Sequence, residues 1–433
     1  MIRWLLGTAA LALAAPVAAQ SVAITNAKLV IGDGSAPVEG ATVVIEGGKV
    51  IAAGKGVAAP RGVEVVDAGG RYVTPGIFAG FTRMGIVEVD GVDETNDAAA
   101  GNSPFHAAID IAPAINPKTS AIALNRAEGI TRAVVAPATR GSIFAGQGAI
   151  IDLGADANSV SHARAFQFLE YGESGARAAG GSRPAAMTAL RDALKAARAY
   201  AKAPGAYLDQ GRDVLVNRAD AAALLPVIEG RVPLLVHVER ASDMRALIAL
   251  KQENPTLKMV FVGASEGWMI ANELAAAKIP VLASALNDLP ESFEMLAATQ
   301  SNVGRMKAAG VVVGLGIIND NDARQARYEK QYAGNLVALT KVPGASGLGW
   351  DAAFASITGG AAEAIGLGGE FGTLKPGRRG DVVIWSGDPL ELDSVAESVY
   401  IDGVKQSLST RQGELLKRYR QPQEGALPKA YER

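Results

Sequence analysis

Short apolar runs separated by glycine-rich turns fill the chain from position 21 to about position 72. This pattern is typical of short strands joined by tight turns, and it predicts a small antiparallel β-domain. Its expected strands lie at 22–25, 27–31, 41–45 and 49–52. Strands this short bury little surface by themselves. Two apolar runs near the other end, at 382–385 and 399–401, are expected to complete one discontinuous domain.

Between these ends, apolar runs of strand length alternate with stretches of helical period, as expected of βα units around a parallel sheet. Buried strands are expected at 232–238, 258–262 and 310–315, because continuous apolar runs suit strands that are covered on both faces. A helix is predicted over 184–201, where apolar residues recur at steps of three and four. These residues are Met187, Leu190, Leu194, Ala197 and Ala201.

Length and charge set limits on the class of protein. The 433 residues exceed the size at which one hydrophobic core is common, and 49% of them are apolar, which is ample material for a core. The formal net charge is −2 and no basic cluster stands out, which argues against nucleic acid as a partner. The charged last segment, 411–433, predicts a short helix followed by a loose tail.

The first residues have the features of a secretory signal peptide. Arg3 gives a positive start, an apolar run follows from Leu5 to Ala15, and small residues at 17–19 form a cleavage site. The run is shorter than the about 20 apolar residues that a membrane helix needs, and no later segment qualifies. We therefore expect a signal peptide over 1–19, a periplasmic or secreted protein and no membrane span. The chain has no cysteine, so any metal would be held by His, Asp or Glu.

Two motifs carry a resemblance to a known family. The segment VTPGIFAGFTRMG at 73–85 resembles the first barrel strand of the amidohydrolase superfamily, and GTLKPGRRGD at 372–381, with VVIW and DPL after it, resembles the return of that chain into its small β-domain. Between them, EGITRAVVAP at 128–137, GQGAII at 146–151 and AKIPV at 277–281 are similar to segments of secreted, imidazolonepropionase-like amidohydrolases. The resemblance covers nearly the whole chain.

The resemblance implies an α/β fold, a (β/α)8 TIM-like barrel with a small discontinuous β-sandwich domain formed by the N- and C-terminal segments. We expect the small domain at 20–72 plus 370–410, the barrel at 73–369 and the tail at 411–433. Chemistry in such a barrel lies at the C-terminal ends of the strands. The implied activity is metal-dependent hydrolysis of C–N bonds, because a bound metal makes a nucleophile of water at neutral pH.

Most of the metal ligands that the resemblance implies are replaced in this chain. Phe81 and Arg83 stand in place of the His-x-His on the first strand, Gly263 in place of a later histidine, and Ile317 or Ile318 in place of the terminal aspartate. The bridging position falls closest to Phe168, with Glu170 and Glu173 nearby. His237 alone matches its position. The chain holds three histidines, His106, His162 and His237, so a four-histidine site is excluded by count.

Arg83 brings a fixed positive charge and up to five hydrogen-bond donors to the place of a metal ligand. One interpretation is a ligand site for a carboxylate or phosphate, which Phe81, Phe168 and Gln147 would line. The other is a structural salt bridge to the acidic loop that follows. That loop contains Glu88, Asp90, Asp93 and Glu94, and its oxygens are also a weak candidate for Ca²⁺. Candidate catalytic residues are His237, Glu266 and Asp320.

Three hypotheses follow from this sequence. The first is a degenerate amidohydrolase-fold protein without cofactor that binds a small molecule or peptide in the old pocket. The second is a subunit that pairs with an active homologous amidohydrolase. The third is a metal-dependent hydrolase of amide, peptide or cyclic amide bonds with a remodelled, mononuclear zinc site around His237. Replacement by Phe, Gly and Ile removes polarity, which favours the degenerate protein over the hydrolase.

Overall fold

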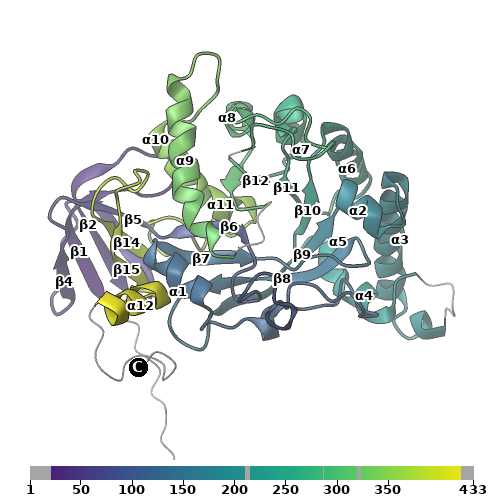
Figure 1. Ribbon diagram of the computed structural model, residues 1–433, viewed down its shortest axis with the longest axis horizontal. Coiled ribbons are helices and arrows are strands. Elements are labelled where there is room, and N and C mark those ends of the chain that lie inside the picture. Colours follow the sequence, from purple (N-terminus) through teal and green to yellow (C-terminus); the bar gives the residue numbers. More distant parts are fainter. Residues whose placement is uncertain (1–20, 210–214, 286, 319–322, 421–433) are drawn as a thin grey trace, which may run out of the picture.

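The computed structural model describes residues 21–209, 215–285, 287–318 and 323–420. A small β-domain lies beside a larger barrel of strands and helices (Figure 1). The expected signal peptide at 1–19, the candidate Asp320 and the expected tail beyond Arg420 lie outside the described residues. In the described part of the chain, no helix combines the length and apolar character needed to cross a membrane.

The small domain is one sheet built from both ends of the chain. Its strands are β1 (Val22–Leu29), β2 (Val38–Glu46), β3 (Lys49–Lys55), β4 (Glu64–Asp67), β5 (Tyr72–Pro75), β14 (Val382–Trp385), β15 (Ala396–Ile401) and β16 (Val404–Lys405). They follow the order β16-β15-β14-β5-β1-β2-β3, with β4 beside β1. The antiparallel pair of β5 and β14 joins the two ends. The two strands expected at 22–25 and 27–31 are one strand, β1, which is irregular at Asn26 with φ of 51°.

The barrel is a second sheet of eight strands in the order β13-β12-β11-β10-β9-β8-β7-β6. Its strands are β6 (Ile77–Thr82), β7 (Ile130–Val135), β8 (Phe144–Asp152), β9 (Val160–Glu170), β10 (Leu234–Val238), β11 (Met259–Gly263), β12 (Val281–Ala283) and β13 (Val313–Leu315). The fold expected from the resemblance is confirmed, and the three buried strands lie where predicted. One strand departs from the all-parallel pattern, because β8 runs antiparallel to both β7 and β9.

Two glycines let the first and last barrel strands approach each other. A Cβ atom on Gly80 of β6 would lie 2.1 Å from the carbonyl oxygen of Leu315 at the end of β13. A Cβ atom on Gly316 would lie 2.9 Å from the backbone nitrogen of Phe81. The absence of both side chains therefore allows the sheet to come nearly full circle.

Helices cover the outside of the barrel (Figure 1). The α-helices are α1 (Ser120–Ala127), α2 (Glu173–Ala178), α3 (Arg183–Lys202), α4 (Arg218–Ala223), α5 (Leu225–Ile228), α6 (Ala241–Glu253), α7 (Ala271–Ala277), α8 (Asn302–Ala308), α9 (Glu329–Ala338), α10 (Trp350–Ser356), α11 (Gly359–Ala364) and α12 (Arg411–Arg420). The 3₁₀ segments are η1 (Asp93–Thr95), η2 (Ala112–Ala114), η3 (Ala206–Asp209), η5 (Gly267–Ile270), η6 (Gln325–Tyr328) and η7 (Leu339–Lys341).

The helix predicted over 184–201 is α3. The Ser182 side chain accepts a hydrogen bond from the backbone nitrogen of Ala185 at its start. Leu190, Leu194 and Ala197 of the predicted stripe are buried, whereas Ala201 is exposed. The stripe is therefore right in its centre and ends one turn earlier than expected.

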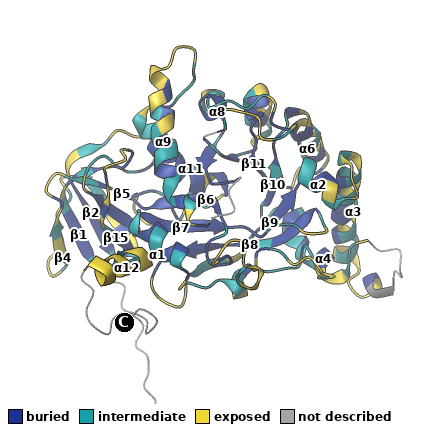
Figure 2. Cartoon of the chain, in the orientation of Figure 1, coloured by how far each residue is buried: buried dark blue, intermediate teal, exposed yellow. Residues whose placement is uncertain are grey.

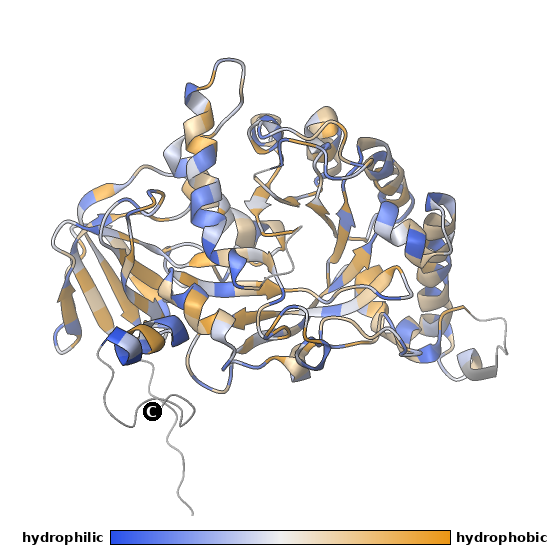
Figure 3. Cartoon of the chain, in the orientation of Figure 1, coloured by the Kyte–Doolittle hydropathy of each residue, from blue (hydrophilic) through white to orange (hydrophobic). Residues whose placement is uncertain are grey.

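The apolar interior follows the strands. The barrel strands are almost wholly buried (Figure 2), and apolar residues dominate them (Figure 3). Phe78, Phe166 and Leu235 belong to a buried cluster formed by the inward-facing side chains of the barrel.

A buried arginine holds the two domains together. Arg132 of β7 is 1% exposed and donates to both carboxylate oxygens of Asp381, at 2.7 and 3.0 Å. It also pairs with Asp402 at 2.8 Å and with Asp152 at 3.6 Å. Asp381 and Asp402 belong to the C-terminal part of the small domain, so this network crosses from the barrel to the sheet beside it.

Glu329, the first residue of α9, gives a pH-dependent test of the packing. It is fully buried, and neither carboxylate oxygen makes a hydrogen bond within the described residues. Burial raises the pKa of Glu329 well above its usual range, although the nearby backbone N–H of Gly80 opposes the shift. A raised pKa means that the associated stability is present below the ordinary glutamate pKa and is lost as pH rises through the folded-state pKa.

We expect Glu329→Gln to remove the loss of folding stability that accompanies a rise in pH. The free energies of unfolding of the variant and the parent should be similar at pH 5, and the variant should be more stable at pH 8. Urea unfolding at the two pH values measures the difference. Glu253→Gln, at an exposed carboxylate that pairs with Arg191, is the control. An advantage of the Gln variant that does not grow with pH would show that Glu329 is ionised in the folded protein.

Candidate functional site

The candidate site lies at the C-terminal ends of neighbouring barrel strands. Glu170 is the last residue of β9, and His237 lies one residue before the end of β10. The two residues are partners in the parallel register of these strands. Side chains alternate along a strand, so both follow inward-facing apolar residues, Phe168 and Leu235, and face the barrel interior at its mouth.

His237 lies between two carboxylates. Its Nδ1 atom is 2.6 Å from Oε2 of Glu170, and its Nε2 atom is 2.9 Å from Oε1 of Glu239. Burial alone would lower the pKa of His237, but Glu170 and Glu239 outweigh it and raise the pKa well above the ordinary value. The raised pKa and the two short contacts favour a charged ring that donates from both nitrogens.

Glu239 fills the space beside Gly263. It is fully buried, and its second oxygen accepts a hydrogen bond of 2.8 Å from the backbone nitrogen of Ser265. A Cβ atom on Gly263, which has φ of 89°, would lie 2.2 Å from Oε1 of Glu239. Gly263 is the position where the resemblance places a metal-binding histidine. No side chain fits at Gly263 while Glu239 holds this place.

Arg83 lies near the same group of charges. It follows the end of β6 at Thr82, and its guanidinium carbon is 5.9 Å from the centre of the Phe81 ring. Burial lowers the pKa of Arg83, whereas the charges of Glu170 and Asp90 raise it. Of the four acidic residues expected beside Arg83, Asp90 is thus an electrostatic partner. Arg83, Glu170, His237 and Glu239 are called the mouth cluster below.

The two phenylalanines of the predicted ligand site lie inside the barrel. The Phe81 and Phe168 rings are 5.4 Å apart and tilted by 54°, and the residues are 2% and 1% exposed. Phe168 precedes Glu170 by two positions on the same face of β9, so the rings form an apolar layer beneath the mouth cluster.

The other described candidate residues make their contacts outside the mouth cluster. Glu266 accepts from the backbone nitrogen of Ala241, the first residue of α6, at 2.9 Å, so it satisfies a helix start. Gln147 of β8 donates to the carbonyl oxygen of Ala108 at 3.2 Å and lines a different cavity. His162 pairs with Glu370 at 3.2 Å. Asp320 lies outside the described residues.

The donor set does not fit the binuclear metal site of the resemblance. Within the described residues, no three His, Asp or Glu side chains are arranged to hold a metal ion. The nearest carboxylates, Glu170 and Glu239, each contact one ring nitrogen of His237, so a metal would have to displace a carboxylate from the ring before it could bind there. The exposed acidic loop that was the Ca²⁺ candidate also forms no such group among these residues.

Comparisons with known proteins agree with the fold. No protein-family model matches the chain. The amidohydrolase tasK of Hapsidospora irregularis is 23% identical over 385 aligned positions, and the match covers 80% of this chain. This chain spans 37%, about a third, of the length of that curated relative.

Solved structures give the same result. An amidohydrolase from Thermotoga maritima MSB8 has a TM-score of 0.77 at 23% identity, and the match covers 89% of this chain and 99% of the other. A molinate hydrolase has a TM-score of 0.54 at 17% identity, with coverage of 94% and 98%. An adenosine deaminase from Xanthomonas campestris with bound zinc has a TM-score of 0.51 at 15% identity, with coverage of 94% and 98%. These likenesses confirm the resemblance at the level of the fold.

Proposed function

We propose that this chain, which has the amidohydrolase fold, binds a small ligand at the mouth of its barrel and does not carry out metal-assisted hydrolysis. The observation that carries the proposal is the state of His237, the one histidine that matches a ligand position. Each of its ring nitrogens lies within hydrogen-bond distance of a carboxylate, at 2.6 and 2.9 Å. A metal ligand needs a free lone pair on one of these nitrogens.

The charges of the mouth cluster support this interpretation. Metal ions would supply positive charge at the mouth of a catalytic barrel, and here Arg83 and His237 supply it. Glu170 and Glu239 balance these two cations, so the cluster is neutral as a whole. A neutral, mutually paired cluster is stable without a bound ion, although it generates no hydroxide.

Arg83 is the group that we assign to the ligand. It stands at a former metal position and carries a planar fork of donors that matches a carboxylate or phosphate. Because the charges of the mouth cluster already balance, the paired donors of the Arg83 fork and not a net positive charge would select an anionic group on the ligand. We therefore propose a small molecule or peptide that carries a carboxylate. Phe81 and Phe168 would form the floor beneath it.

The hydrolase remains the second candidate, because one observation favours it. Glu170 ends the fourth barrel strand and adjoins His237 on the fifth, so two neighbouring positions keep groups that bind Zn²⁺ once His237 loses its proton. Export through the segment 1–19 and pairing with an active homologous subunit are also proposed. The sequence features of that segment support export.

Metal content separates the two functions. We expect untagged mature protein, purified without chelators and then offered Zn²⁺, Mn²⁺ or Ca²⁺, to retain well below one ion per chain by elemental mass spectrometry. The physical reason is the pair of carboxylates that hold the proton on each nitrogen of His237. His162→Ala, at a histidine that pairs with Glu370 away from the mouth, is the control. About one ion per chain that is lost in His237→Ala but kept in His162→Ala would support the hydrolase.

A further inference from the structure

A cavity of about 610 Å³ lies at the opposite end of the barrel from the mouth cluster. Its lining includes the residues just before β10, β11 and β12, such as Pro233, Lys258 and Pro280, and the turn that follows α11. These parallel strands begin here and end at the mouth. The cavity, called the basal pocket below, therefore lies at the N-terminal face of the barrel, where conserved features usually serve stability.

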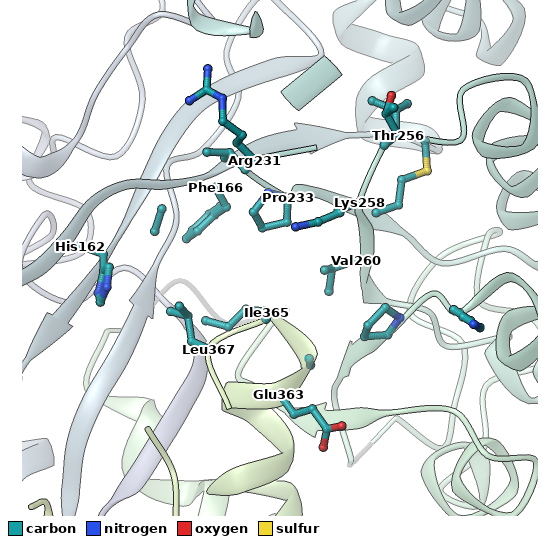
Figure 4. A pocket seen from close by; sticks show the side chains of 18 of the residues that line it. His162, Phe166, Arg231, Pro233, Thr256, Lys258, Val260, Glu363, Ile365 and Leu367 are labelled. Carbon is teal, nitrogen blue, oxygen red and sulfur yellow. The ribbon is translucent and has the colours of Figure 1, made fainter. Parts of the chain in front are cut away.

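Apolar side chains form the wall of the basal pocket. Phe166, Val260 and Ile365 are 1%, 3% and 6% exposed, and they belong to the inward-facing cluster of the barrel. Figure 4 shows these side chains facing the same space as Leu367 and Pro233. Because the wall is part of the barrel core, the pocket is formed before any ligand arrives. Its volume suits a small organic molecule.

Positive charge surrounds this wall. The cations among its lining residues are Arg164, Arg231, Lys251, Lys258 and Lys278, and the carboxylate is Glu363. The arginines have partners, because Arg164 lies 3.5 Å from Asp110 and Arg231 donates to Glu229 at 2.7 Å. Across the described residues, no carboxylate lies within 4.0 Å of the ammonium nitrogen of any of the three lysines. The whole chain has a net charge of −2, so the excess of positive charge around this pocket does not reflect a positively charged protein.

The positions of two of these lysines are partly explained by the helix ends at which they lie. Lys251 lies in the last turn of α6 and Lys278 at the end of α7, where a cation is favoured by the helix dipole. Lys258 has no such explanation, because it immediately precedes strand β11. Figure 4 shows the Lys258 side chain running beside Pro233 within the pocket. Three lysines, two of them from the α6–β11 region and one from the end of α7, thus line one cavity with an apolar wall.

We propose that the basal pocket binds a small anionic amphiphile of the alkyl carboxylate class. The apolar tail would lie against the partly exposed Val232, Pro233 and Leu367, with the buried wall behind them, and the carboxylate would pair with Lys258 and its neighbouring lysines. A molecule of this kind matches both parts of the pocket, whereas a polar anion leaves the wall unused and an uncharged lipid leaves the lysines unused. This site is separate from the mouth cluster, and the proposal does not rest on the function assigned there.

The test uses dodecanoate below its micelle concentration and the full mature chain, with isothermal titration calorimetry as the measurement. We expect saturable binding of one molecule per chain that weakens as NaCl is added. The double variant Lys251→Glu, Lys258→Glu should weaken the affinity at least tenfold. Lys195→Glu, at an exposed lysine on the outer face of α3, should leave it unchanged. Thermal melting of each variant checks that it is folded.

Two further ligands test the chemical class. Dodecanol should bind at least tenfold more weakly than dodecanoate, and dodecyltrimethylammonium should not bind in the basal pocket. Absence of saturable dodecanoate binding to the parent protein would overturn the proposal. Equal binding of the three head groups would overturn the role of the lysines, and an unchanged affinity in a folded double variant would move the ligand to another place on the molecule.

Discussion

Replacing Arg132 with methionine is expected to lower the free energy of unfolding by about 3–5 kcal/mol, because it removes one partner from a buried ion network. The guanidinium pairs with Asp381 at 2.7 Å, with Asp402 at 2.8 Å and with Asp152 at 3.6 Å. Burial alone lowers the pKa of Arg132, but these three carboxylates raise it above its ordinary value. Without the cation, three acidic groups would be left together at the junction of the two domains.

Urea unfolding at pH 7 measures this loss, and two variants make it specific. Arg126→Met removes another buried arginine, one that donates to the carbonyl oxygens of Leu153 and Ser407, and it should cost less because no carboxylate is left unpaired. Equal losses in the two variants would show that the carboxylates do not matter.

Asp152→Asn, in contrast, should raise the free energy of unfolding. Burial raises the pKa of Asp152 to about 6, although Arg132 lowers it. A raised pKa of this kind makes the folded protein lose stability as pH rises through 6, so the neutral asparagine should be more stable by about 1–3 kcal/mol above that pH. The asparagine oxygen can still accept the hydrogen bond from the backbone nitrogen of Gly154.

The sequence patterns located most of the fold because they depend on local periodicity. The apolar runs at 232–238 and 258–262 are strands β10 and β11, and the helical period over 184–201 is α3. The run at 382–385 coincides with β14, which joins the small domain as expected. Burial on both faces of a strand leaves a signal that a single sequence carries.

The antiparallel β8 left no comparable signal. Its residues, from Phe144 to Asp152, read as a buried strand whatever its direction. The direction depends on hydrogen bonds with the neighbouring strands and on the connection lengths, and apolar periodicity does not record either. Apolar periodicity also does not show that the chain continues as one strand through Asn26. The pattern divides β1 into two strands there, although the backbone passes through Asn26 with a positive φ.

The sequence names two residues of the mouth cluster but does not reveal the contacts between its members. The motif positions point to His237 and Arg83, and they place the bridging position closest to Phe168, with Glu170 and Glu173 nearby. No local pattern connects Glu239 with Gly263, because Glu239 follows β10 and Gly263 ends the neighbouring strand β11. Gly263 leaves room for the buried Glu239 side chain, and this relation is seen only when the neighbouring strands are placed side by side in the structure.

Glu239→Gln should change the protonation of His237. The parent His237 is expected to stay charged well above pH 6.5, because Glu170 and Glu239 together outweigh the effect of its burial on the pKa. The glutamine keeps the shape of the side chain and an acceptor for the Ser265 nitrogen, but it removes one negative charge at 2.9 Å from Nε2. We expect the pKa of His237 to fall by at least about one unit and the stability to fall by about 3 kcal/mol.

NMR titration of the imidazole signals measures the pKa, and the assignment is simple because the chain has only three histidines. A raised pKa means that the stabilisation from this ion pair is complete below the ordinary histidine pKa of about 6.5 and is lost as pH rises through the folded-state value. Urea unfolding should therefore show the largest difference between parent and variant in that lower range. Glu273→Gln, at an exposed carboxylate that pairs with Arg245, controls for the loss of one charge. A parent His237 that titrates near 6.5 would show that the carboxylates do not hold its proton, and a nitrogen would then be free for a metal.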